Sequence, residues 1–343
     1  SMHKTLAVAG THGKTTTSSI LAHILKTANV NVAAFLGGIA RNYNSNIILP
    51  VSEHDVINVV EADEFDRSFL TLFPFAAAIT SMDADHLDIY GSGEELKKTY
   101  QQFASQVDEK GLLVLRSGLQ LQPVKAMTKF YAAGAQAEFY ADKISIRNHR
   151  YCFNFHFPDG VIDNLSLGLP GRHNVENAVA AIALAMKVGV KEEDVRAALQ
   201  SYKGVKRRFD IRYADVNCTF IDDYAHHPEE LRAAIMSVRE LFEGKKITGI
   251  FQPHLFSRTR DFADEFAASL ALLDEVVLLD IYPARELPLE GITSSWLMNK
   301  IKHDNKILLG KTAVLDYINK HKPEVLITLG AGDIDTLVTP IQQ

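Results

Sequence analysis

Short apolar runs alternate with segments of helical periodicity along the first part of the chain. Leu6–Gly10 has the pattern of a buried strand, and Thr15–Ala28 predicts a helix because its apolar residues recur at helical spacing. The apolar runs lack strict alternation with polar residues, which favours a parallel sheet covered on both faces. Further strands are predicted at Val32–Leu36, Val56–Glu61, Ala76–Ser81 and Leu112–Leu115.

The pattern changes at residues 138–168, where aromatic and aliphatic residues roughly alternate with polar ones, as in a half-exposed antiparallel patch. Helices are predicted at Asn174–Val188 and near Glu192–Gln200, and the basic segment Gly204–Asp210 has the character of a link between domains. Strand–helix alternation then resumes, with strands at Thr219–Ile221, Ile247–Phe251, Val276–Asp280 and Val325–Leu329 and helices at 228–242 and 261–272.

This order predicts an α/β protein of two domains. Residues 1–208 are expected to form a central P-loop ATPase-type domain of three layers, and residues 209–343 a smaller Rossmann-like C-terminal domain.

Composition narrows the class of function. The net charge of −6 over 343 residues argues against a general nucleic-acid binder, which needs a basic face. No apolar run reaches the roughly 18 residues needed to span a membrane, and no secretory signal opens the chain. Cys152 and Cys218 stand apart from any metal-binding or disulfide pattern, which fits the cytoplasm.

The segment GTHGKTTT at 10–17 lies between a predicted strand and a predicted helix. In that context backbone amides and the helix N-terminus face an anion, Lys14 reaches the β- and γ-phosphates of ATP, and Thr15 meets Mg²⁺. The loop is a variant, because Val8 occupies the first glycine position of the strict pattern. The alternative is a glycine-containing turn with an incidental lysine. The predicted nucleotide contacts are Gly10, Thr11, His12, Gly13, Lys14, Thr15 and Thr16.

Carboxylates and a histidine follow two further strands. Glu61 and its acidic neighbours come at the end of one strand, and His86 follows another. Ligands gather at the carboxyl ends of strands in open α/β sheets, so Glu61 is a candidate Mg²⁺ ligand and His86 a candidate for a second metal. The alternatives are an acidic solvated loop and an ordinary surface histidine.

Three more loops carry polar groups. His173 and Asn174 precede a helix, where they suit either an N-cap or an adenine site. In the second domain, polar residues follow two strands of one predicted sheet and suit binding of carboxylate or phosphate, the alternative being solvated helix starts. These residues are Asp223, Tyr224, His226, His254 and Arg258.

Together the motifs resemble the Mur ligases, the ATP-dependent amino-acid-adding enzymes of peptidoglycan synthesis. The resemblance implies a UDP-binding domain, a central ATPase and a C-terminal domain that closes over the active site. It begins at the ATPase, so we expect the chain to hold the last two domains only. The matching pieces are GTHGKTTT (10–17), EADEFD (61–66), DADHLDIYG (83–91), GRHNVENA (171–178), KGVKRRFD (203–210), DDYAHHP (222–228), FQPHLFSRTRD (251–261) and GAGDI (330–334).

The resemblance also assigns roles. It implies that Thr15 and Glu61 bind a first Mg²⁺ and His86 a second, and that Arg208 and Asp223 complete the ATP site. Near the adenine it places His173, Asn174 and Asn177. At the amino-acid and acyl-phosphate end it places Tyr224, His226, His254 and Arg258, with Lys14, His86, His254 and Arg258 as the catalytic groups.

Two positions depart from the family's pattern. Leu255 stands where an arginine is often found, and Tyr100 stands where several sister ligases carry a carbamylated lysine. The alanine-adding branch would lack that modification, and we expect none on Lys97 or Lys98.

The implied reaction joins L-alanine to the lactyl carboxylate of UDP-N-acetylmuramate through an acyl phosphate, with ATP and Mg²⁺. The nearest alternative is the recycling ligase that adds a whole tripeptide, although FQPHLFSRTRD favours the alanine-adding branch. Folylpolyglutamate synthase is more distant, and DDYAHHP argues against it. A non-catalytic P-loop module would leave the polar residues at 222–260 unexplained.

Overall fold

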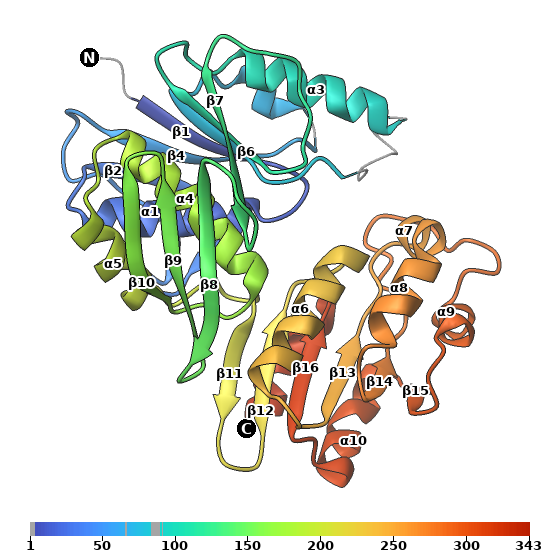
Figure 1. Ribbon diagram of the computed structural model, residues 1–343. Coiled ribbons are helices and arrows are strands. Elements are labelled where there is room, and N and C mark those ends of the chain that lie inside the picture. Colours follow the sequence, from blue (N-terminus) through green and yellow to red (C-terminus); the bar gives the residue numbers. More distant parts are fainter. Residues whose placement is uncertain (1–3, 66, 84–89, 91) are drawn as a thin grey trace. The chain divides into compact units, whose positions relative to one another are not determined.

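The computed structural model describes residues 4–65, 67–83, 90 and 92–343, and the chain divides into two compact units, Ser1–Lys206 and Arg207–Gln343 (Figure 1). Each unit is an α/β structure with its own sheet. The elements of the first unit are β1 (Lys4–Ala9), α1 (Lys14–Thr27), β2 (Val32–Ala40), β3 (Ser45–Ile48), β4 (Ile57–Ala62), η1 (Ser68–Thr71), β5 (Ala76–Ile79), α3 (Gly93–Ser105), β6 (Leu112–Arg116), β7 (Met127–Ala133), β8 (Phe139–Arg147), β9 (Arg150–Phe157), β10 (Gly160–Leu167), α4 (Arg172–Lys187) and α5 (Glu192–Ser201).

The first unit is built on a ten-stranded mixed sheet in the order β10-β9-β8-β7-β6-β5-β1-β4-β2-β3. Its centre is parallel, and β1 pairs with both β4 and β5. The strands β8, β9 and β10 pair antiparallel and extend the same sheet, so the alternating pattern at 138–168 is confirmed as an antiparallel patch. The carboxyl ends of β1, β4 and β5 therefore lie side by side.

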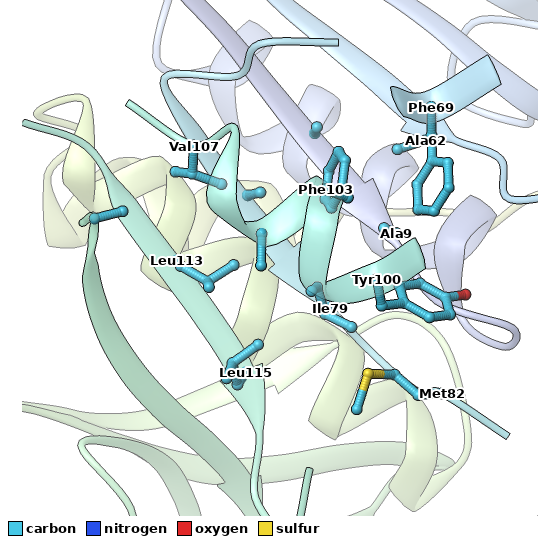
Figure 2. Close-up of a cluster of buried hydrophobic side chains, with 14 of the residues drawn as sticks. Ala9, Ala62, Phe69, Ile79, Met82, Tyr100, Phe103, Val107, Leu113 and Leu115 are labelled. Carbon is cyan, nitrogen blue, oxygen red and sulfur yellow. The ribbon is translucent and has the colours of Figure 1, made fainter. Parts of the chain in front are cut away.

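Helices cover both faces of this sheet. Helix α1 packs against α4 and α5 on one face, where Leu6 and Val8 of β1 are fully buried. On the other face, Ala7 and Ala9 of the same strand join a core cluster with the apolar side of α3. Figure 2 shows Tyr100 and Phe103 of that helix among Ile79, Met82 and the neighbouring strands.

The second unit contains a six-stranded sheet in the order β11-β12-β16-β13-β14-β15, with β11 antiparallel to β12 and the remaining pairs parallel. Phe220, Ile250 and Leu326 of this sheet pack with Val314 of α10 in one buried cluster. The elements are β11 (Asp210–Ala214), β12 (Thr219–Asp223), α6 (Pro228–Leu241), β13 (Ile247–Phe251), α7 (Phe256–Asp261), α8 (Ala263–Leu270), β14 (Glu275–Leu278), α9 (Ser294–Lys300), β15 (Lys306–Leu308), η2 (Lys311–Ala313), α10 (Val314–His321), β16 (Val325–Leu329), η3 (Asp333–Leu337) and α11 (Val338–Gln342).

The predicted α/β class is confirmed in both units, and several elements differ from expectation. The helix expected at 261–272 is present as the shorter α8, and a separate helix that was not predicted, α7, precedes it with a non-helical residue, Phe262, between them. Helix α3 was not predicted, although Ser92 caps it and Leu96, Tyr100 and Phe103 recur on one face. Among the described residues, no helix is long and apolar enough to cross a membrane.

Candidate active site

The phosphate loop lies between β1 and α1, and two of its glycines are required by the backbone. Gly10 has φ +136°, and a Cβ there would overlap the Thr80 hydroxyl. Gly13 is the N-cap of α1 with φ +82°, and a Cβ there would lie 2.7 Å from Asn177 Oδ1. Such a conformation favours glycine, and it brings the loop against two other elements before the helix begins.

The end of β5 holds the loop from the side. Ser81 Oγ accepts a hydrogen bond from the His12 amide at 2.7 Å and lies 2.8 Å from Thr11 Oγ1. The Thr80 hydroxyl lies 3.1 Å from the carbonyl oxygen of Ala9 and also contacts that of His12. The His12 amide is therefore bonded to the segment that follows β5. The sequence did not mark Thr80 and Ser81 as site residues, because a Thr-Ser pair closing a strand carries no distinctive pattern.

Thr15 and Glu61 face each other at the first turn of α1. Thr15 Oγ1 donates a hydrogen bond to Glu61 Oε1 at 2.9 Å, and the Gly37 amide donates to Oε2 at 2.8 Å. A hydroxyl and a carboxylate are the hard oxygen donors that Mg²⁺ prefers when phosphates and water complete its shell. The pair therefore fits the predicted magnesium site.

The predicted second metal ligand, His86, lies outside the described residues. Within residues 4–65, 67–83, 90 and 92–343, no three His, Cys, Asp or Glu side chains gather into a metal-binding group. Mg²⁺ in nucleotide sites commonly takes only one or two protein carboxylates, so the Thr15–Glu61 pair remains the candidate that the described residues offer.

Lys14 lies beside two carboxylates that follow β4. Its Nζ is 2.8 Å from Glu64 Oε2 and 3.6 Å from Asp63 Oδ1. Burial by itself lowers the pKa of Lys14, but the neighbouring carboxylates, Glu64 foremost, together outweigh that effect and the pKa lies above its usual value. Burial also raises the pKa of Glu64, and the Lys14 ammonium opposes that rise. The ammonium is held at the loop as a charged group.

Asn177 of α4 reaches the same loop. It is buried beside Gly13, and its Nδ2 donates to Asn174 Oδ1 at 3.3 Å. Asn174 in turn donates to the carbonyl of Pro170 at 2.5 Å. The N-cap of α4 is Gly171, and His173 and Asn174, which were expected in the N-cap region, lie in the first helical turn. The polar start of α4 thus adjoins the phosphate loop, as an adenine site beside it would require.

In the second unit, the predicted substrate residues gather at the carboxyl ends of β12 and β13. The ring centroids of Tyr224 and His226 are 5.3 Å apart, and those of His226 and His254 are 6.1 Å apart. Arg258 Nη1 lies 3.5 Å from His254 Nδ1. The structure therefore brings these four residues together, although they come from the segments after two different strands, with Arg258 on α7.

Burial keeps both histidines uncharged near neutral pH. It lowers the pKa of His226, and it lowers that of His254 to about 4 with help from His226 and Arg258. Arg258 is itself 9% exposed and supplies the positive charge of the cluster. Leu255, the departure from the family's pattern, sits at the N-cap of α7 with φ +69° and offers no charge there.

Arg208 and Asp223 are neighbours in the second unit. Asp223 accepts hydrogen bonds from the amides of Phe209 at 2.6 Å and Ala225 at 2.8 Å, and burial raises its pKa to about 6 while Arg208 opposes the rise. The Arg208 guanidinium lies 5.0 Å from the centre of the Tyr224 ring and 3.9 Å from Glu230. Arg208 thus adjoins both Asp223 and Tyr224 of the histidine-containing cluster.

The other departure from the family's pattern lies on α3. Tyr100 is fully buried in the core of the first unit, whereas Lys97 and Lys98 are exposed on that helix. Burial raises the pKa of the Tyr100 hydroxyl well above its usual value. The absence of a carbamylated lysine stays a prediction.

Two family models match the chain and together cover most of it. The model of the Mur ligase middle domain matches residues 8–185, and that of the Mur ligase glutamate ligase domain matches residues 207–332. Each match falls within one of the two compact units.

Individual relatives agree with the models. The UDP-N-acetylmuramate–L-alanine ligase of Porphyromonas gingivalis (strain W83) is 51% identical over 100% of this chain, which spans 76% of that protein. The crystal structure of the UDP-N-acetylmuramate-alanine ligase MurC of Thermotoga maritima superposes with a TM-score of 0.83 at 29% identity, covering 99% of this chain and 74% of that one. The MurF ligase of Thermotoga maritima in complex with ADP shares the fold, with a TM-score of 0.76 at 19% identity over 99% of this chain and 79% of that one.

Proposed function

The chain belongs to the Mur ligase family of ATP-dependent amide ligases, and from that premise we propose that it joins L-alanine to the lactyl carboxylate of UDP-N-acetylmuramate. The 51% identity to a ligase of that name supports the choice of substrates. The site observation that carries the proposal is the placement of Lys14, Thr15 and Glu61 at the phosphate loop, where a triphosphate and its metal need them.

The chemistry must overcome the poor reactivity of a carboxylate toward amines. In the proposed reaction the lactyl carboxylate attacks the γ-phosphorus of ATP, ADP leaves, and an acyl phosphate forms. The amine of L-alanine then attacks the acyl carbon, phosphate leaves, and the nitrogen releases a proton. Negative charge accumulates in both steps, so the site must supply positive charge and exclude water.

The described residues can meet these needs. Lys14 offers a positive charge to the β- and γ-phosphates, and the start of α1 offers backbone amides. Thr15 and Glu61 would hold Mg²⁺, which supplies charge stabilisation as a Lewis acid when bound. Arg258 would stabilise the anionic acyl group, and the uncharged His254 can hydrogen-bond without adding charge.

Other roles follow from position. We assign adenine contacts to His173, Asn174 and Asn177, because the start of α4 adjoins the phosphate loop. Tyr224 and His226 would line the amino-acid side beside His254. Arg208 and Asp223 would complete the nucleotide site, His86 would bind a second metal, and the enzyme would act in the bacterial cytoplasm.

The test is phosphate release that depends on the amino acid. The chain is incubated with MgATP, UDP-N-acetylmuramate and either L-alanine or a tripeptide, and phosphate and product are measured. Product with L-alanine alone supports the proposal, whereas product with the tripeptide alone indicates the recycling activity. Nucleotide binding without phosphate release, also in a longer protein that includes the UDP-binding domain implied by the family, indicates a non-catalytic module.

Lys14→Ala tests the role of the phosphate loop in the same assay. We expect loss of ATP turnover, since the lysine charge is removed from the transferring phosphate. Lys98→Ala is the control, because Lys98 is an exposed lysine of α3 that pairs with Glu95 on the helix surface. Unchanged single-turnover kinetics in Lys14→Ala would contradict the assigned role.

A further inference from the structure

Glu64 is a fully buried residue whose carboxylate contacts Lys14 of the phosphate loop. Its side chain is 0% exposed, and its Oε2 accepts a hydrogen bond from Lys14 Nζ at 2.8 Å. Fifty residues separate the two in sequence, and they meet because β1 and β4 are paired neighbours in the sheet. The sequence motifs indicate metal binding for Glu61 and imply no role for Glu64.

Hydrogen bonds to its carbonyl oxygen hold the backbone of Glu64 in place. The carbonyl oxygen of Glu64 accepts hydrogen bonds from the Arg67 amide at 3.0 Å and from the Tyr90 hydroxyl. The Glu64 carboxylate is itself enclosed by protein and hydrogen-bonded to Lys14, unlike Asp63, whose side chain is 59% exposed and lies 3.6 Å from the ammonium. A buried, hydrogen-bonded charge pair resists disruption far more than an exposed pair does.

The contact limits where the Lys14 ammonium can go. A lysine side chain has four rotatable bonds, and ordering it costs conformational entropy when a ligand binds. An ammonium has three donors, so a hydrogen bond to Glu64 leaves others for a phosphate. A charge that is already in place when the ligand arrives is a preorganised charge, which strengthens binding of the ligand and of the transition state.

We propose that Glu64 is the positioning residue of the phosphate loop: it holds the Lys14 ammonium in place for the β- and γ-phosphates of ATP. This inference rests on the proposed function, because it takes the loop to be a nucleotide site. It assigns Glu64 a part separate from Glu61, which faces Thr15 instead. Glu64 acts through Lys14 and need not touch the nucleotide.

The test compares ATP with AMP, which lacks the two phosphates that Lys14 would reach. Binding of each nucleotide to the whole chain is measured by calorimetry, with Mg²⁺ present. In Glu64→Gln, a change of similar size that removes the charge, we expect ATP affinity to fall about tenfold or more and AMP affinity to stay the same. Asp63→Asn removes the exposed one of the two carboxylates beside Lys14 and should change ATP affinity by less than about twofold.

A double-mutant cycle separates positioning from general damage to the fold. Lys14→Met removes the group on which Glu64 acts, so adding Glu64→Gln to it should cause no further loss of ATP affinity. The double variant Lys14→Met/Glu64→Gln removes the buried charge pair as a whole, which is better tolerated than removal of one partner. It therefore remains informative even where Glu64→Gln alone folds poorly.

Three results would overturn the inference: ATP binding by Glu64→Gln as tight as in the unmodified chain or tighter, equal losses for ATP and AMP, or the same loss in the Lys14→Met background. Tighter binding would mean that Glu64 competes with phosphate for the lysine. A different result would contradict the proposed function: normal ATP binding by Lys14→Met. Loss of binding in Lys14→Met with none in Glu64→Gln would refute only the role of Glu64.

Discussion

The Thr15 hydroxyl donates a 2.9 Å hydrogen bond to the Glu61 carboxylate, and the bond joins the first turn of α1 to the end of β4. The parallel pairing of β1 with β4 sets Ala9 opposite Ala62, so the residues that follow these strands emerge together at one edge of the sheet. The Thr15–Glu61 pair, a candidate metal site, depends on strand register. A one-residue slip would turn Glu61 to the other face.

Glu61→Gln should weaken the dependence of ATP binding on Mg²⁺. The amide keeps the size of the side chain but loses the charge that favours the cation, and we expect the apparent Mg²⁺ affinity to fall about 100-fold or more. Magnesium titrations at fixed ATP measure this. Glu53→Gln, in an exposed loop of the same unit, is the matched control. An unchanged magnesium titration in Glu61→Gln would remove Glu61 from the metal site.

Gly13→Ala should lower the free energy of unfolding by more than the strain of its backbone conformation alone would, and it should also weaken nucleotide binding. Any non-glycine residue at φ +82° costs about 1–2 kcal/mol, and the added Cβ also meets Asn177 Oδ1 at 2.7 Å. Gly189→Ala has a comparable φ of +91° with nothing within 4 Å of its Cβ, so it isolates the conformational cost.

Urea unfolding and nucleotide binding are measured for both glycine variants. We expect both to lose free energy of unfolding, Gly13→Ala the more, and only Gly13→Ala to lose nucleotide binding. Equal effects of the two substitutions on binding would show that the contact with Asn177 is unimportant.

His23 should make the first unit less stable in mild acid. Burial lowers the pKa of His23 to about 4, with Tyr43 Oη 2.7 Å from its Nδ1 and Ser201 Oγ 3.0 Å from its Nε2. The unfolded chain binds this proton at its ordinary pKa of about 6.5, so stability falls as pH drops from about 6.5 to 4, by about 3 kcal/mol at most.

Unfolding free energies measured between pH 4 and 7.5 check the role of His23. His23→Gln should flatten the pH dependence in this window, whereas His54→Gln, at an exposed position, should leave it unchanged. An identical slope in the unmodified chain and in His23→Gln would show that the buried histidine does not set the acid response.

Arg258→Met should raise the pKa of His254. Burial is the largest cause of its depression to about 4, and the charge of Arg258 adds to it. Removing that charge should move the pKa upward while leaving it below the ordinary value of about 6.5. Titration of the imidazole by NMR measures the change. Arg260→Met, on the same helix with a side chain 52% exposed and paired to Asp261, should have no effect, and a shift there as large would contradict the argument.

Several features were predictable because their signals are local. The GTHGKTTT segment lies between a strand and a helix, as its pattern required, and the strands Ile247–Phe251 and Val325–Leu329 were predicted with the bounds that the structure has. Glu61, Tyr224 and His254 were placed near strand ends because polar groups directly follow apolar runs. Helix α3 also carried a local signal in its Ser92 cap and apolar spacing, but it was not predicted.

The sequence by itself determined the α/β class, the phosphate loop and the strand ends that carry polar groups, since each depends on residues close together along the chain. Only the tertiary structure decided that Thr80 and Ser81 hold the loop, that Asn177 meets Gly13, and that Lys14 pairs with Glu64. These partners are tens of residues apart or more. Their contacts follow from strand order and from which helices cover the sheet, and neither is set by the residue types at the contact itself.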